Sequence, residues 1–312
     1  MKEIEENNPE ASNEELSNLK DALRQAIDDG DMKRAGDLKA QIMPHLSVLR
    51  GELSSRFDEA KEIMGDDFLG PEAIKETFGI KVETKDVPEI PFSKKELERA
   101  KELEQFLVLR VDKSGLEDPL TIGKMADIVG FDIDSEEDLL MEDTIDENAP
   151  ETGWALVTTR LVPLSKNRDY FEQVGALAQY LHAQVFKGEA VPKVYQEALS
   201  EYVKEQVSIL REISAMKTEA LESVTDLEIT KLLMPTASEA VYDMLMYCAN
   251  SNGKLNMFGM PGDTHGVVTR DTVYQGTGSV EVAVDSGTII LRYDTVHRTP
   301  DTATGTLFAR RF

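Results

Sequence analysis

Carboxylates, histidines and one cysteine are the side chains of this sequence that could bind a metal ion or attack a substrate. The segment DIDSEED, residues 132–138, has carboxylates at spacings found in calcium loops. It lacks the glycine at the sixth loop position and the terminal glutamate of an EF-hand. We therefore interpret residues 132–147 as an acidic, solvated loop, and whether it binds a metal stays open.

The histidines and the cysteine form no recognisable catalytic pattern. Cys248 lies in the apolar stretch DMLMYCAN, which favours a buried structural thiol over a nucleophile. The stretch GMPGDTHG lacks the spacing of a phosphate-binding loop and is typical of a connector. Neither the HExxH motif nor a paired spacing relates the four histidines, which are His45, His182, His265 and His297. We predict no catalytic residue, no metal site and no cofactor.

The C-terminal tail, residues 265–312, offers side chains for binding instead. Residues 1–264 contain 20 lysines and 33 glutamates, whereas the tail contains no lysine and one glutamate, Glu281. The tail also lacks methionine and tryptophan, and Gln275 is its only glutamine. Strand propensity explains why the tail is rich in threonine. It explains less well why lysine, glutamine, methionine and tryptophan are scarce together while arginine, aspartate and histidine remain.

An alternating pattern predicts which tail residues pack and which face outward. Val280, Val282 and Val284 alternate with other residues, and a second strand follows the turn DSG. We expect Ile289 and Leu291 to pack, and Ile290 and Arg292 to point the other way. The predicted ligand-binding surface consists of Tyr274, Arg292, Tyr293, Asp294, His297, Arg298 and Asp301. Such side chains supply amphipathic area, forked donors and acceptors.

Helices must position this tail, because helical periodicity dominates the chain before it. We expect a disordered lead over residues 1–11 and an α-helical hairpin region over 12–86, capped at Ser12 and broken at 28–31. An α+β body follows over 87–312, with its C-terminal β-rich unit at 265–312. In the body, strands at 106–112 and 153–163 predict a small antiparallel sheet, which the tail strands join. Capping boxes begin helices at Ser93 and Thr236.

Composition limits the partners and the compartment. The net charge of −25 repels nucleic acid and anionic lipid, and no run of basic residues offsets it. We expect no nucleic acid partner and no membrane insertion. One cysteine rules out an intramolecular disulfide. The acidic N-terminus lacks the features of a signal peptide, which predicts a cytoplasmic protein. Unconventional export or attachment to a larger particle stays open.

Several motifs resemble those of a family of uncharacterised bacterial proteins. They are FLGPEAI with FGI (68–80), PFSKKELERAKELEQFLVLRVDK (91–113), GWALVTTRLVP (153–163), ASEAVYDML and the final LFARR. The C-terminal region of that family is similar to the C-type-lectin-like domain of variable proteins of diversity-generating retroelements. In such systems, altered adenines in asparagine codons yield many residue types, but not Lys, Glu, Gln, Met or Trp. These five types are scarce in the tail.

The resemblance implies a C-type-lectin-like unit at the C-terminus and a non-enzymatic protein that binds a protein or surface ligand. Diversification of the tail by a retroelement would explain its composition. Such domains commonly carry a tryptophan in the variable stretch, whereas Trp154 lies outside this tail. Two alternatives remain. One is an assembly protein that forms homo-oligomers through its N-terminal helices, and the other is an enzyme of unrecognised type with Asp132, Asp134 or a histidine as metal ligands.

Overall fold

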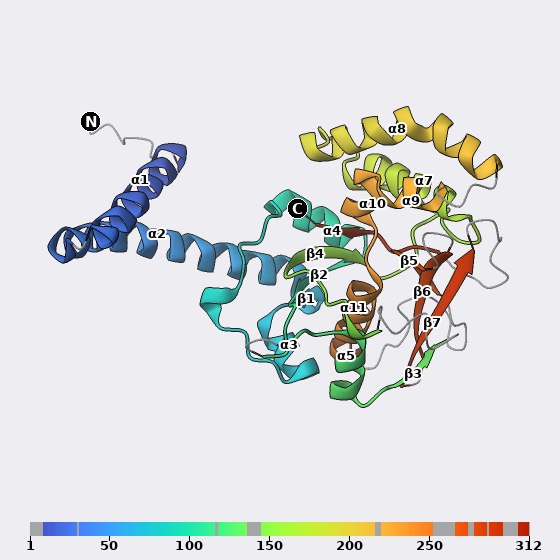
Figure 1. The fold of residues 1–312 in the computed structure, drawn as a ribbon, viewed down its shortest axis with the longest axis horizontal. Coiled ribbons are helices and arrows are strands. Elements are labelled where there is room, and N and C mark those ends of the chain that lie inside the picture. The colour runs from blue at the N-terminus through green and yellow to red at the C-terminus, as the bar shows by residue number, and fades with distance from the viewer. Residues whose placement is uncertain are drawn as a thin grey trace. The chain divides into compact units, whose positions relative to one another are not determined.

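The fold was analysed in a computed structural model (Figure 1). It describes residues 9–29, 31–115, 118–135, 145–215, 220–251, 266–273, 278–285, 287–295 and 305–311. The chain divides into two units, Met1–Ala60 and Lys61–Phe312. Both are built as the sequence predicts at a coarse level, with helices first and a mixed α+β body after them.

The first unit consists of α1 (Pro9–Asp28) and most of α2 (Met32–Met64). The predicted break at 28–31 is confirmed. Helix α1 begins at Pro9, three residues before the predicted cap at Ser12, and proline is well tolerated in the first turn of a helix. Ala26, Ala35 and Ile42 are buried. Antiparallel pairing of these helices stays a prediction.

The second unit contains short helices and two four-stranded sheets. Its longer helices are α3 (Pro71–Phe78), α4 (Lys94–Glu102), α5 (Ile122–Val129), α7 (Tyr170–Tyr180), α8 (Lys193–Ser214), α9 (Ala220–Thr225), α10 (Glu228–Leu233) and α11 (Ala237–Asn250). Single turns of 3₁₀ or π helix lie at Gly65–Asp67, Thr84–Asp86 and Leu181–Val185. The capping boxes predicted at Ser93 and Thr236 are both present, and Asp169 forms a third one at the start of α7.

The first sheet has the order β1 (Phe68–Leu69), β2 (Gln105–Arg110), β4 (Gly153–Thr158) and β8 (Ala309–Arg310). Strands β2 and β4 are antiparallel, which confirms the predicted pair. The sheet is mixed rather than wholly antiparallel, because β1 runs parallel to β2. Strand β4 ends at Thr158, five residues before the predicted end, since Pro163 lies in a turn outside the sheet.

The second sheet has the order β3 (Asp132–Ser135), β7 (Thr288–Thr295), β6 (Gly278–Asp285) and β5 (Val267–Val273). Strands β5, β6 and β7 form an antiparallel meander, and β3 pairs parallel with β7. The interpretation of residues 132–135 as loop is therefore wrong. Ile133 is the least polar residue of this stretch and lies opposite Ile289, so the strand gains an apolar neighbour that the acidic composition concealed.

Helix α11 connects the two sheets. It contacts β1 and β2 of the first sheet and β5 and β6 of the second, and Figure 1 shows it between them. Nearly every side chain from Ala237 to Met246 is buried, which an amphipathic surface helix would not show. The Tyr242 hydroxyl donates to the Leu109 carbonyl at 2.9 Å. A helix buried on both sides fixes the distance between the sheets.

The tail crosses from one sheet to the other. Strands β5 to β7 belong to the second sheet, whereas β8 pairs with β4 in the first. The segment from Gly305 to Arg310 that leads into and forms β8 is buried throughout. The expectation that the tail joins the earlier strands is confirmed for β8, whereas β5, β6 and β7 form a second sheet with β3. Gly305 still pairs with Val267 of β5, and the chain enters the first sheet only at β8.

Candidate functional site: the C-terminal strands and their buried anchor

The inner face of the second sheet carries the apolar residues that the alternation predicts. Val280, Val282, Ile289 and Leu291 have no exposed surface. On the opposite face of β7, Ile290 is partly exposed and Arg292 is exposed. On β7 the predicted split into a packed face and an outward face is therefore confirmed for the side chains described.

The outward face is narrower than the sequence suggests. Glu281 lies opposite Arg292 in the antiparallel register, yet its exposed fraction is 7%. Ala283, its neighbour on the same face of β6, is 8% exposed. Since the outer side of β6 is covered, the exposed part of this face lies on β7 and on β3, whose Asp132 and Asp134 are exposed opposite Thr288 and Ile290.

The structure describes only some of the predicted ligand-binding residues. Arg292 is exposed on β7. Tyr293 and Asp294 continue the same strand, and their side chains lie outside the described part. The remaining predictions, Tyr274, His297, Arg298 and Asp301, fall outside the described residues. Their gathering into one surface stays a prediction.

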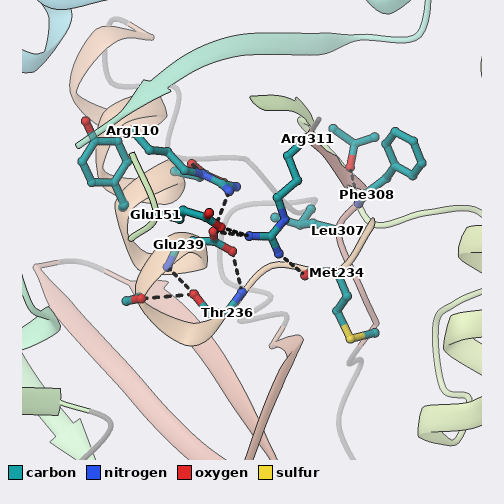
Figure 2. Close-up of polar contacts among 12 residues, drawn as sticks. Arg110, Glu151, Met234, Thr236, Glu239, Leu307, Phe308 and Arg311 are labelled. Atoms are coloured by element: carbon teal, nitrogen blue, oxygen red, sulfur yellow. Dashed lines mark hydrogen bonds and ion pairs between the residues drawn. The ribbon is translucent and has the colours of Figure 1, made fainter. Parts of the chain in front are cut away.

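Four charged residues anchor this region, of which three are buried and Arg311 is partly exposed. We refer to Arg110, Glu239, Asp243 and Arg311 as the arginine–carboxylate cluster. Arg110 on β2 donates from Nε and Nη2 to the Asp243 carboxylate at 3.0 and 2.5 Å. Its Nη1 lies 3.1 Å from Glu239 Oε1. Arg311 donates from Nη1 to the same Glu239 oxygen at 2.5 Å (Figure 2). Glu239 thus bridges an arginine from the first sheet and one from the end of the chain.

Local sequence explains how the two carboxylates come together. Glu239 and Asp243 are four residues apart on α11 and share one face of that helix. Thr236 and Glu239 form the capping box that starts the helix, and the Glu239 carboxylate also accepts from the Thr236 N–H. Asp271 of β5 accepts from the Ala237 N–H at 2.6 Å. The positive end of the α11 dipole therefore faces two carboxylates.

The pKa values of the cluster reflect a balance between burial and pairing. Burial alone would raise the pKa of Glu239, but Arg110, Arg311 and the Thr236 N–H hold it below its ordinary value. Burial alone would lower the pKa of Arg110, yet Asp243 and Glu239 raise it. Burial lowers the pKa of Arg311 despite the attraction of Glu239. Burial raises the pKa of Asp243 even though Arg110 lies beside it, so Glu239 is the carboxylate of the cluster whose pKa pairing holds below its ordinary value.

The geometry of the cluster suits an anchor better than a reaction centre. Arg110, Glu239 and Asp243 are at most 2% exposed, so solvent and substrate do not reach their carboxylates. Each carboxylate oxygen with a contact is directed at a guanidinium or a backbone N–H. Arg311 also donates to the Lys231 and Met234 carbonyls, which fixes the chain end on α10.

A second buried arginine holds the adjacent residue. Arg310 is 1% exposed and donates from Nη1 to Glu96 Oε1 at 2.8 Å. Its guanidinium lies 4.9 Å from the Phe92 ring centroid and 5.3 Å from that of Phe186. Such stacking favours arginine over lysine. Both consecutive arginines of the tail are therefore paired with carboxylates from the body.

The capping boxes predicted at Ser93 and Thr236 imply roles for Glu96 and Glu239 as helix caps, but no sequence pattern predicts that these residues anchor the tail. Their signal was a charged residue at the end of, or within, an apolar run, as in FLVLR, AVYDML and LFARR. A charge in such a run requires a buried partner. The sequence shows that partners are needed, but it does not show which distant charges supply them.

The other candidate residues lie apart from this cluster. Burial raises the pKa of the Cys248 thiol to about 11, which keeps it protonated at neutral pH and fits the predicted structural thiol. His182 is exposed on the π turn. Asp132 and Asp134 lie on β3, and the described residues hold no group of three or more His, Cys, Asp or Glu placed to bind a metal ion. No helix in the same part of the chain is long and apolar enough to cross a membrane.

We predict that Glu239→Gln lowers the free energy of unfolding by about 3–5 kcal/mol at pH 7, since it removes one charge from a buried ion pair. Because the pKa of Glu239 is depressed, its stabilising effect is complete above its ordinary pKa of about 4.5 and is lost as the pH falls through the lower folded value. The difference in unfolding free energy between wild type and Glu239→Gln, measured by urea unfolding, should therefore disappear at acid pH.

Glu172→Gln is the matched control, because Glu172 occupies the same capping-box position on α7 but is 47% exposed. It should cost only about 0.5–1 kcal/mol. Equal losses for the two variants would show that Glu239 acts as a cap alone and not as the bridge of the cluster.

Comparisons with known proteins identify no relative of this chain. No family model matches it. No curated protein and no solved structure matches it either. The function must therefore be inferred from the residues of the chain itself.

Proposed function

We propose that this chain is a non-enzymatic binding protein that presents a recognition surface on its C-terminal strands. The observation that carries the proposal is the split of β7, where Ile289 and Leu291 are fully buried and Arg292 points outward. A scaffold whose buried residues are fixed can accept changes at its outward positions. The ligand is a protein or another surface molecule.

The anchoring of the tail at both ends supports this proposal. Strand β7 is held between β3 and β6, and the chain end is held by the buried Arg310 and by the ion pair of Arg311 with Glu239. Residues between two such fixed points can change without loosening the fold around them. The predicted binding residues His297, Arg298 and Asp301 belong to this interval.

We also propose that the tail is a C-type-lectin-like unit diversified by a retroelement. Its support is the joint scarcity of lysine, glutamate, glutamine, methionine and tryptophan in residues 265–312, together with the resemblance of its motifs. The only glutamate of the tail, Glu281, is buried, whereas Arg292 opposite it is exposed. A residue type excluded by mutagenesis would persist at a fixed structural position such as this one.

We predict a gradient of tolerance along β7. Ile289→Ala and Leu291→Ala should each lower the free energy of unfolding by about 2–5 kcal/mol, because they leave cavities in the core. Ile290→Ala and Arg292→Ala should each cost less than about 1 kcal/mol, as is usual at surface positions. Urea unfolding of the four variants measures the gradient. If the four variants lose equal amounts of unfolding free energy, both faces of β7 are part of the core, and β7 does not present a binding surface.

Diversification makes a prediction about the DNA. We expect a near-repeat of the 3′ end of the coding sequence downstream of the gene, differing from it mainly at adenines, and a reverse transcriptase gene nearby. Sequencing of this locus tests the expectation. If neither is found, the diversification proposal is wrong. The proposal that the tail binds a ligand is tested separately, by the unfolding of the four β7 variants.

Assembly through the N-terminal helices is a second candidate function. The specific observation is Ile27, which is 54% exposed on α1 although its neighbour Ala26 is fully buried. We propose that α1 and α2 form an antiparallel hairpin whose exposed apolar residues associate with a second copy. Ile27→Lys should then reduce the oligomer seen by light scattering, while Lys20→Ala on the same helix, at an exposed polar position, should not. A wild-type monomer at all concentrations would contradict this candidate.

A further inference from the structure

Strand β3 is the outermost strand of the second sheet in the part of the chain that the structure describes. It pairs with β7 on one side, and no described strand lies on its other side (Figure 1). Such an edge presents backbone N–H and C=O groups to which another chain can pair. Proteins commonly block an exposed edge with charged side chains or cover it, so the residues around β3 determine what this edge can accept.

The backbone of Ile133 faces the outer side of this edge. The Asp132 N–H donates to the Gly287 carbonyl at 3.0 Å, toward β7. Backbone groups alternate in direction along a strand, so those of Asp134 also point to β7 and those of Ile133 point away from it. Neither the N–H nor the carbonyl of Ile133 has a partner among the described residues. A residue of an added strand can therefore form two hydrogen bonds here.

The outward face of β3 is acidic. Asp132 and Asp134 are exposed on this face, where they lie opposite the uncharged Thr288 and Ile290 of β7. Neither carboxylate forms an ion pair or a hydrogen bond within the part of the chain described. Cross-strand pairs of opposite charge stabilise neighbouring strands. Two exposed carboxylates at alternate positions therefore favour an added strand that carries positive charge at alternate residues.

The inner side of the same strand borders a hollow of about 460 Å³. Ile133 lines this hollow, together with residues of α5 and of the segments beside it. The charged residues of its lining are Asp118, Lys124, Asp127 and Asp146. Lys124 pairs with Asp118 at 3.4 Å, whereas Asp127 and Asp146 have no cationic partner in the described ranges. The hollow has room for side chains of an added strand, and its net charge is also negative.

We propose that an extended basic segment of a partner protein pairs with β3 as an added strand. Its backbone bonds to Ile133, its lysines or arginines lie beside Asp132 and Asp134, and the side chains between them enter the hollow. Charge complementarity identifies the partner as basic, because both sides of this edge are acidic and the whole chain carries a net charge of −25.

This inference rests on the proposed function, because β3 borders the outward face of β7, and it names the class of ligand. A short blocked peptide of alternating lysine and threonine is the probe, and fluorescence anisotropy at low salt measures its binding to the full chain. A peptide of alternating lysine and proline is the control. It has the same charge, but proline has no N–H to donate to the Ile133 carbonyl. We expect the lysine–threonine peptide to bind more tightly.

Asp132→Lys combined with Asp134→Lys reverses the charge of the outward face but keeps the edge charged, so this variant should fold and stay soluble. Asp66→Lys combined with Asp86→Lys is the matched control. It makes the same change of charge at exposed positions on 3₁₀ turns outside the second sheet. We expect the β3 variant to bind the lysine–threonine peptide about tenfold more weakly than wild type, and the control variant less than about threefold more weakly.

Three results would overturn the inference. The first is that wild type does not bind the lysine–threonine peptide. The second is that it binds both peptides equally, which would show that no strand is added. The third is that the β3 variant loses no more affinity than the control variant, which would show that the peptide responds only to the net charge of the chain. The unfolding of the four β7 variants tests the proposed function separately, so that proposal would survive each of these results.

Discussion

The bridge that Glu239 makes between Arg110 and Arg311 is the interaction on which the second unit depends. It joins a strand of the first sheet, the start of the central helix and the end of the chain at distances of 3.1 and 2.5 Å. Pairing offsets the desolvation of three charges only if the geometry is good, since a buried charge without a partner is strongly destabilising. A slip of β2, α11 or the chain end by one residue would therefore leave an unpaired charge, so the cluster specifies register as well as contributing to stability.

The same constraint determines which residues of the tail are fixed and which can vary. Its strands do not form a separate module, because β7 completes one sheet and β8 completes the other. Between them Gly305 pairs with Val267 of β5, so the chain stays on the second sheet until Ala309 and Arg310 pair with β4 of the first. Fixed ends and a fixed inner face are the conditions under which outward residues can vary without loss of the fold. The anchor and the proposed recognition surface are thus two consequences of one arrangement.

Local patterns predicted much of this fold, whereas pairings between distant residues were beyond them. Capping boxes at Ser93 and Thr236 depend on residues three positions apart, and the strand pair β2–β4 on two strong apolar runs. Strand β3 was missed, because its only apolar residue, Ile133, lies between aspartates and is stabilised by β7, more than 150 positions later. The cluster was missed for the same reason, since Arg110 and Asp243 are 133 residues apart. The alternation of packed and outward residues from Ile289 to Arg292 was predictable from the sequence. Whether the predicted binding residues form one surface depends on distances between residues far apart in the chain, which sequence patterns do not give.

The tail contains arginine but no lysine, and the explanation differs between its buried and its exposed arginines. Arg310 is buried, and its guanidinium contacts Glu96 and two ring faces. Arg311 is partly exposed, and its guanidinium donates to Glu239 and two carbonyls. A lysine ammonium would satisfy neither arrangement, so structure alone selects arginine at these positions. Arg292 differs from both, because its side chain is exposed on β7. Burial therefore accounts for arginine at the anchor, and the diversification that we propose concerns only the absence of lysine from the rest of the tail.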